Sequence, residues 1–161
     1  MKSCFFIGHR NTPSELLPVL EQTIEHHIQA YGVTEFIAGR YGDFDHLAAR
    51  AVIALKSKYP QITLSLLIPY HPAERPIEKP AGFDNTFYPP GMEKVPRKFA
   101  IVRANLYMVN HVDYLIAYAW HPASNARNLM EYAQKRSVVI CNLGQTPFGQ
   151  HSAVAGVKDK Y

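Results

Sequence analysis

Short apolar runs alternate with longer segments of helical period along this chain, and no other feature constrains the fold as strongly. Runs of continuous β-branched and aliphatic residues are typical of strands that are buried on both faces. In the longer segments, apolar residues recur every three or four positions, which predicts helices. The expected strands are Ser3–Gly8, Thr34–Ala38, Ile62–Ile68, Val112–Tyr118 and Ser137–Asn142. The expected helices are Pro13–Tyr31, Phe44–Ser57, Pro96–His111 and Ala123–Arg136.

Strands that alternate with helices form βαβ units, and their crossovers are right-handed, so helices cover both faces of a parallel sheet. We therefore predict an α/β fold, a three-layer Rossmann-like domain with a five-stranded, mostly parallel sheet. The chain has 161 residues, of which 47% are hydrophobic. This is enough to bury one core, so residues 1–161 are expected to form a single domain.

Composition excludes several classes of protein. The hydrophobic content is too high for a disordered chain, and no run of about 18 apolar residues predicts a membrane span. Two cysteines cannot build a disulfide framework, and no secretory signal is apparent, so we expect a cytoplasmic protein. A net charge of +4 suits a ligand that carries phosphate. The basic residues are not clustered densely enough to predict nucleic-acid binding.

One segment interrupts the alternation. Residues 69–96 hold seven of the twelve prolines. A loop of this length is usually functional or disordered. It is either a rigid surface excursion, covering a sheet edge or a neighbouring subunit, or a lid over a ligand. The polar tail, 145–161, is expected to be loosely held.

Ligands of open parallel sheets bind beyond the carboxyl ends of the strands, where the strand order reverses. The residues that follow the first four predicted strands are rich in Gly, Arg, His and aromatic side chains, so we expect a small-molecule site there. Its candidate ligand-binding residues are Gly8, His9, Arg10, Gly39, Arg40, Tyr41, Gly42, Asp45, Tyr70, Asn105, Trp120, Ser124, Asn125, Ala126, Arg127 and Asn128.

The first two turns combine glycines with charge. Gly8 would let the backbone approach a ligand closely, and Arg10 would grip a phosphate with paired hydrogen bonds, unless it is a solvated loop residue. Gly39 and Gly42 lead into a predicted helix, whose N-terminus favours anions. Alternatively, this segment has no ligand role and Asp43 simply caps the helix. Asp45 would accept hydrogen bonds from a ribose or orient Arg40.

The last turn places Arg127 in the first turn of a helix, where its charge opposes the helix dipole. An anionic ligand explains such a position better than folding does. Glu131 can share a face with Asn128 and is a candidate catalytic residue, unless it is simply solvated. Arg103, on the preceding helix, is a second candidate catalytic residue or otherwise an exposed side chain.

Motifs for other chemistries are missing. The eight histidines do not form a metal-ligand pattern, and no Cys-x-x-Cys or His-Glu-x-x-His spacing is present, so no metal site is predicted. The Walker A and Gly-x-Ser-x-Gly motifs are also absent. The lack of Gly-x-Gly-x-x-Gly counts against an ordinary dehydrogenase.

The motifs together resemble the YpsA-like branch of the SLOG superfamily, which includes the DprA/SMF and LOG (lysine-decarboxylase-like) proteins. The resemblance covers nearly all of residues 3–141. It is carried by IGHR at Ile7–Arg10, AGRYGDFDHLAARA at Ala38–Ala51, YPQITLSLLIPY at Tyr59–Tyr70, RANLYMVNHVDYLIAY at Arg103–Tyr118 and ASNARNLMEYAQKR at Ala123–Arg136.

This resemblance implies a binder of a nucleotide or a nucleotide derivative such as an ADP-ribose-like molecule; no other cofactor is expected. Superfamily members are often homo-oligomers. LOG proteins cleave the bond between base and ribose phosphate, with a Pro-Gly-Gly-x-Gly-Thr-x-x-Glu motif that falls on residues 123–131. Its Glu is retained as Glu131, and its glycines are replaced by Ser124, Asn125 and Arg127.

Three functions stay open on the sequence alone. The first is binding of a nucleotide-derived ligand for sensing or sequestration. The second is hydrolysis of a nucleoside phosphate, with Glu131 acting together with Arg103 or Arg10. The third is partner binding through the proline-rich segment.

Overall fold

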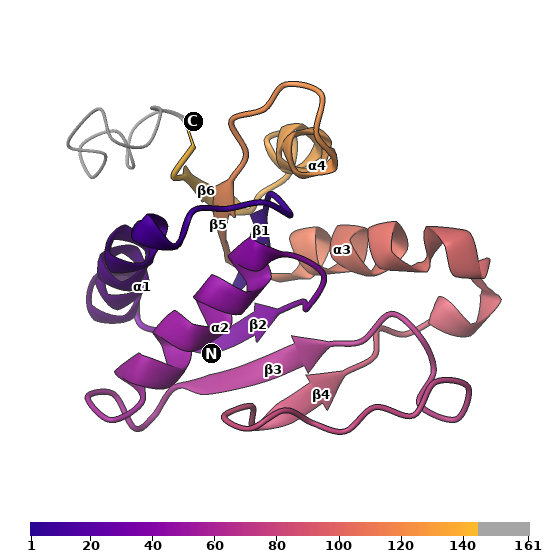
Figure 1. Ribbon diagram of the computed structural model, residues 1–161, viewed down its shortest axis with the longest axis horizontal. Helices are drawn as coiled ribbons and strands as arrows, with labels where there is room; N and C mark the ends of the chain where they lie inside the picture. Colours follow the sequence, from indigo (N-terminus) through magenta and orange to yellow (C-terminus); the bar gives the residue numbers. More distant parts are fainter. Residues whose placement is uncertain (145–161) are drawn as a thin grey trace.

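The computed structural model describes residues 1–144 and shows a parallel sheet with helices on both faces (Figure 1). The strands are β1 (Lys2–Gly8), β2 (Val33–Ala38), β3 (Thr63–Leu67), β4 (Asn85–Phe87), β5 (Tyr114–Tyr118) and β6 (Val139–Asn142). The α-helices are α1 (Leu17–Tyr31), α2 (Asp43–Leu55), α3 (Ala100–His111) and α4 (Asn125–Ala133), and short 3₁₀ helices span Ser14–Leu16, Met92–Lys94 and Arg97–Phe99. The tail predicted at 145–161 lies outside the described residues.

The strand order is β4-β3-β2-β1-β5-β6, and every neighbouring pair is parallel. The chain therefore builds the sheet outward from β1 to one edge, and then returns to the other side of β1 with β5. In register, Cys4 of β1 lies between Phe36 of β2 and Tyr114 of β5. The order reverses between β1 and β5, which is where ligands of such sheets bind.

Each face of the sheet has its own core. Helices α1 and α2 cover one face, where Leu20, Ile24 and Phe44 are fully buried. Helices α3 and α4 cover the other face and bury Met108 and Met130. The two apolar layers confirm the predicted three-layer Rossmann-like α/β fold.

The sheet has six strands rather than the five predicted, because the proline-rich segment contributes β4. This strand pairs with β3 and so covers the edge that β3 would expose. Asp84 fixes it there: its carboxylate accepts hydrogen bonds from Leu64 N–H at 2.8 Å and Lys56 Nζ at 2.6 Å. Covering a sheet edge belongs to the first interpretation of this segment, a rigid surface excursion, rather than to the second, a lid over a ligand.

No helix within residues 1–144 is both long enough and apolar enough to cross a bilayer.

Gly8, at the end of β1, is needed for packing against α2. A Cβ at this position would lie 2.1 Å from Cγ of Phe44, the ring that fills the core between β1 and α2. The absence of a side chain at Gly8 thus makes room for α2, in addition to the ligand approach predicted for it.

Gly8→Ala should therefore destabilise the fold by about 1–3 kcal/mol, the usual cost of overpacking a core. The same substitution should cost clearly less in a Phe44→Leu background, because the smaller side chain leaves space for the methyl group. Urea unfolding of the four proteins in this double-mutant cycle measures both costs. Equal costs in the two backgrounds would contradict the packing role.

Candidate functional site

A cavity of about 490 Å³ opens at the point where the strand order reverses. Its rim is formed by the turns after β1 and β2 and by the end of β3. Its walls are the facing sides of α3 and α4. Twelve of the sixteen predicted ligand-binding residues line it: Gly8, His9, Arg10, Gly39, Tyr41, Gly42, Asp45, Asn105, Ser124, Asn125, Ala126 and Asn128.

The turns after β1 and β2 are joined through their backbones. The N–H of Asp43 donates to the carbonyl of Arg10 at 2.8 Å. A Cβ on Gly42 would lie 2.9 Å from Cα of Arg10, so only glycine permits this approach. The join holds Arg10 at the cavity rim, and no other lysine or arginine of residues 1–144 contributes to the lining.

Asp43 does not cap α2 as predicted. The N-cap of α2 is Gly42, which has no side chain to accept a hydrogen bond. The Asp43 carboxylate instead accepts from the N–H of Thr12 at 3.4 Å and so helps to fix the turn after β1. This leaves the first turn of α2 without a side-chain cap.

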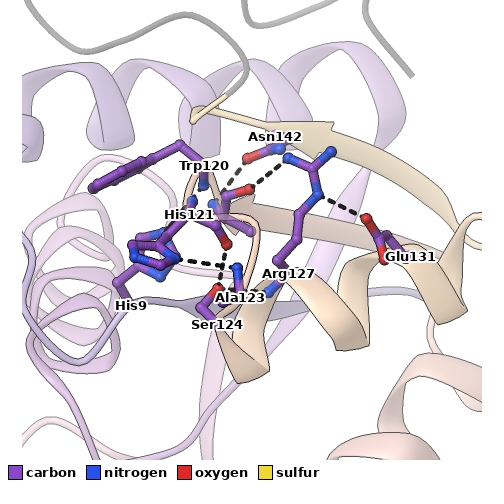
Figure 2. Close-up of polar contacts among 9 residues, drawn as sticks. His9, Trp120, His121, Ala123, Ser124, Arg127, Glu131 and Asn142 are labelled. Carbon is purple, nitrogen blue, oxygen red and sulfur yellow. Dashed lines mark hydrogen bonds and ion pairs between the residues drawn. The ribbon is translucent and has the colours of Figure 1, made fainter.

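His9 connects the two sides of the strand-order reversal. Its Nε2 accepts hydrogen bonds from the backbone N–H groups of Trp120 and His121, at 3.1 and 3.2 Å (Figure 2). Burial, followed by the nearby His121, lowers the pKa of His9. The ring is therefore kept neutral, as an acceptor must be, and it ties the turn after β1 to the turn after β5.

A second contact fixes the turn after β5 from the side of β6. The buried Asn142 side chain accepts, through Oδ1, the N–H groups of Ala119 at 3.1 Å and Gly144 at 2.9 Å. Ser124 then ends the turn as the N-cap of α4, because its Oγ accepts from the N–H of Arg127 at 3.0 Å. The start of α4 is thus held in place at the cavity.

Asp45 is the acidic group of the cavity. Its Oδ2 accepts a hydrogen bond from Tyr41 N–H at 3.0 Å, which turns the carboxyl back over the β2–α2 turn. Burial outweighs this hydrogen bond and raises the pKa of Asp45 to about 6. Keeping Asp45 ionised at neutral pH therefore lowers the stability of the fold. Perturbed pKa values of this kind are common in groups at functional sites.

Both candidate catalytic residues lie outside the cavity, and so does Arg127. Arg127 donates through Nε to Glu131 at 3.0 Å and through Nη1 to the carbonyl of Ala119 at 3.3 Å (Figure 2). The Arg127 charge, expected to meet an anionic ligand, is thus directed at the end of β5 and at its neighbour on α4. Glu131 and Arg103 are exposed, and neither contributes to the lining.

Three other predicted ligand-binding residues are also absent from the lining. Arg40 is exposed beside the rim. Trp120 is half exposed and packs edge-on against the His9 ring, with centroids 5.4 Å apart. Tyr70 lines a second cavity of about 510 Å³, beneath the proline-rich segment.

The apolar part of the cavity was not predicted from the sequence. Ile101, Leu106, Leu129 and Tyr132 form a slot between α3 and α4, over Phe5 and Ile7 of β1. The signal was present in the spacing, because Ile101 and Asn105, like Asn128 and Tyr132, are four residues apart on one helix face. Each pair places an amide beside an apolar side chain.

Within residues 1–144 no group of three or more His, Cys, Asp or Glu is arranged to hold a metal ion. No protein-family model matches the chain. No curated protein matches it either.

Asp45→Asn should stabilise the protein at pH 7.5 by up to about 2–3 kcal/mol, which is the free energy equivalent to the raised pKa. In the folded state Asp45 keeps its proton up to about pH 6, whereas the unfolded chain releases it near the usual value of 3.8. The wild type therefore loses stability as pH rises through this window, and the variant does not.

Urea unfolding at pH 4.5 and pH 7.5 measures this difference, with Glu78→Gln, at an exposed position, as the charge control. A stability difference between Asp45→Asn and wild type that is the same at both pH values would contradict the burial of this carboxyl.

Proposed function

We propose that the protein binds a nucleotide or a nucleotide-derived small molecule in the cavity at the reversal of strand order. One observation carries the proposal: a single cavity combines an apolar slot with a rim of glycine turns, two helix N-termini and one arginine. An apolar pocket with a few convergent polar groups is the usual form of a small-molecule site. Its volume is suitable for a mononucleotide.

The slot between α3 and α4 has the character expected of a base-binding site. Leu106, Leu129 and Tyr132 provide apolar and aromatic surface. The amides of Asn105 and Asn128 can each donate and accept, as the edge of a base requires. These amides would select among bases, and the apolar surface would hold the ring.

The rim has the character expected of a ribose-phosphate site. The start of α4, at Asn125 and Ala126, adds N–H groups and the positive end of a helix dipole. Arg10 supplies a full positive charge. The Asp45 carboxylate is suited to accept hydrogen bonds from ribose hydroxyls.

Binding is favoured over cleavage of the ligand. The hydrolytic alternative relied on Glu131 acting with Arg103 or Arg10, and of these three side chains only Arg10 lines the cavity. A glycosidase requires an acid or base placed at the scissile bond, and Glu131, the residue predicted for that role, does not provide one in the cavity. Release of free base from AMP or GMP during incubation with the protein would reverse this preference.

Calorimetric titration with AMP, GMP, CMP and UMP tests the proposal, with inorganic phosphate as the control for the anion alone. We expect at least one nucleotide to bind. Arg10→Ala should weaken that nucleotide about tenfold or more, the scale of a lost charge-assisted hydrogen bond. Arg127→Ala is the matched control and should change affinity less than about threefold, because its guanidinium is engaged by Glu131 and Ala119.

No binding of any of the four nucleotides would overturn the proposal. A loss in Arg127→Ala as large as in Arg10→Ala would show that the phosphate lies elsewhere.

A further inference from the structure

The second cavity, of about 510 Å³, is formed mainly by the proline-rich segment. Its lining begins at Pro69 and Tyr70 in the turn after β3, includes Tyr88 directly after β4, and ends at Ala100, the first residue of α3. Pro69 is the one lining residue that it shares with the candidate nucleotide site. A volume of this size is typical of sites that hold small molecules.

Aromatic side chains form part of the wall. Tyr70, His71 and Tyr88 line the cavity, and the rings of His71 and Tyr88 meet edge to face, with centroids 5.3 Å apart. His71 is fixed in place, because its Nδ1 accepts the N–H of Ala73 at 3.0 Å. The Tyr70 ring already has the Arg75 guanidinium 4.4 Å from its centroid. No cation of residues 1–144 lies over the Tyr88 ring, so that ring is available to a ligand.

The lining is acidic, although the whole chain carries a net charge of +4. Two carboxylates, Glu74 and Glu93, and one guanidinium, Arg97, belong to it. Arg97 forms an ion pair with Glu74, whereas no ion pair within residues 1–144 engages Glu93. Burial, followed by the nearby Glu93 and Glu74, raises the pKa of Tyr88, so both carboxylates lie close to this tyrosine. Glu93 is therefore the charge of the lining that is left without a counter-ion.

The protein's own side chains show which chemistry this wall accepts. The Arg97 guanidinium is paired with the Glu74 carboxylate and lies 5.7 Å from the centroid of the Tyr70 ring. A cation is thus held between a carboxylate and a tyrosine ring. Such rings attract cations through the negative potential of their faces. Glu93 and Tyr88 offer the same combination, and no side chain of the described residues uses it.

Apolar side chains complete the lining. Met92 and Ala100 are buried in the core layer beneath α3, and Val95 packs against them half-buried. All three contribute to the cavity. A ligand that matches the whole lining therefore combines a positive charge with a short apolar chain.

We infer that the second cavity binds a small organic cation of the alkylammonium class, with its charge between the Glu93 carboxylate and the Tyr88 ring and its alkyl chain against Met92 and Val95. Such a ligand is opposite in charge to the nucleotide proposed for the first cavity. The inference does not depend on nucleotide binding.

A pair of matched probes tests the inference. n-Butylammonium carries the charge, and n-butanol has the same chain without it. In titrations of ¹⁵N-labelled protein at pH 7.5 and constant ionic strength, the amide shifts of Ala73 and Val95 report binding. Butylammonium should bind about fivefold tighter than butanol or more, the scale of one partly exposed cation–π or ion-pair contact.

Variants then locate the charge. Glu93→Gln should weaken butylammonium about fivefold and leave butanol unchanged. Glu78→Gln, at an exposed position of the same segment outside the lining, is the matched control and should preserve both affinities. Tyr88→Leu should weaken butylammonium, whereas Tyr88→Phe, which keeps the ring, should bind it within about twofold of wild type. Arg97→Gln should tighten butylammonium, because Glu74 then loses its internal partner.

Equal affinities for butylammonium and butanol would overturn the inference. Equal losses in Glu93→Gln and Glu78→Gln would also overturn it, because the amine would then respond only to surface charge. Weaker binding in Arg97→Gln would show that Arg97 forms part of a site for a different ligand.

Two further outcomes concern the kind of ligand. Nα-acetyl-lysine N-methylamide carries the same ammonium and chain on a peptide unit. Tighter binding of this probe than of butylammonium would assign the cavity to a protein side chain and overturn the inference. Arg10→Ala should bind butylammonium as the wild type does, so failure of every nucleotide to bind the first cavity would leave the inference standing.

Discussion

The central position of β1 determines the rest of the site. Strand β2 pairs with one side of β1, and β5 pairs with the other. After β1 the chain turns to the face of the sheet that α1 covers, and after β5 it turns to the opposite face, which α4 covers. No connection then covers the gap between the carboxyl ends of β1 and β5, and a crevice opens there. The residues that meet at this crevice come from turns more than a hundred positions apart, as with His9 and Trp120.

The crevice is held open by polar contacts rather than by packing alone. His9 ties the turn after β1 to the turn after β5, and Asn142 ties that second turn to β6. Asp43 and Thr12 fix the rim on the other side. A rim that is already ordered saves the entropy of ordering it when a ligand binds. Asp45 differs from these stabilising contacts, because its burial disfavours the charge that it carries at neutral pH.

Local patterns were enough to predict the strands around β1, the helices and the glycine turns, because continuous apolar runs and helical periods leave few alternatives. The strand β4 could not be predicted, since three residues flanked by prolines carry no period and depend on Asp84 reaching β3. The position of Arg127 outside the cavity lining could not be predicted for a similar reason. Its position in the first turn of a helix favoured an anionic ligand as its partner. Its actual partners, the Ala119 carbonyl and the Glu131 carboxylate, accept hydrogen bonds from it and are brought together only by the fold.

The central claim is that one ligand occupies the crevice beside β1, and nuclear magnetic resonance tests it most directly. With ¹⁵N-labelled protein and the nucleotide that binds best, the largest amide shifts should fall in the turns after β1 and β2 and in the first turn of α4, at Arg10, Gly42 and Ala126. Residues at the opposite end of the sheet, such as Gly32, should not move. Shifts confined to other surfaces, or none at saturating nucleotide, would contradict the account.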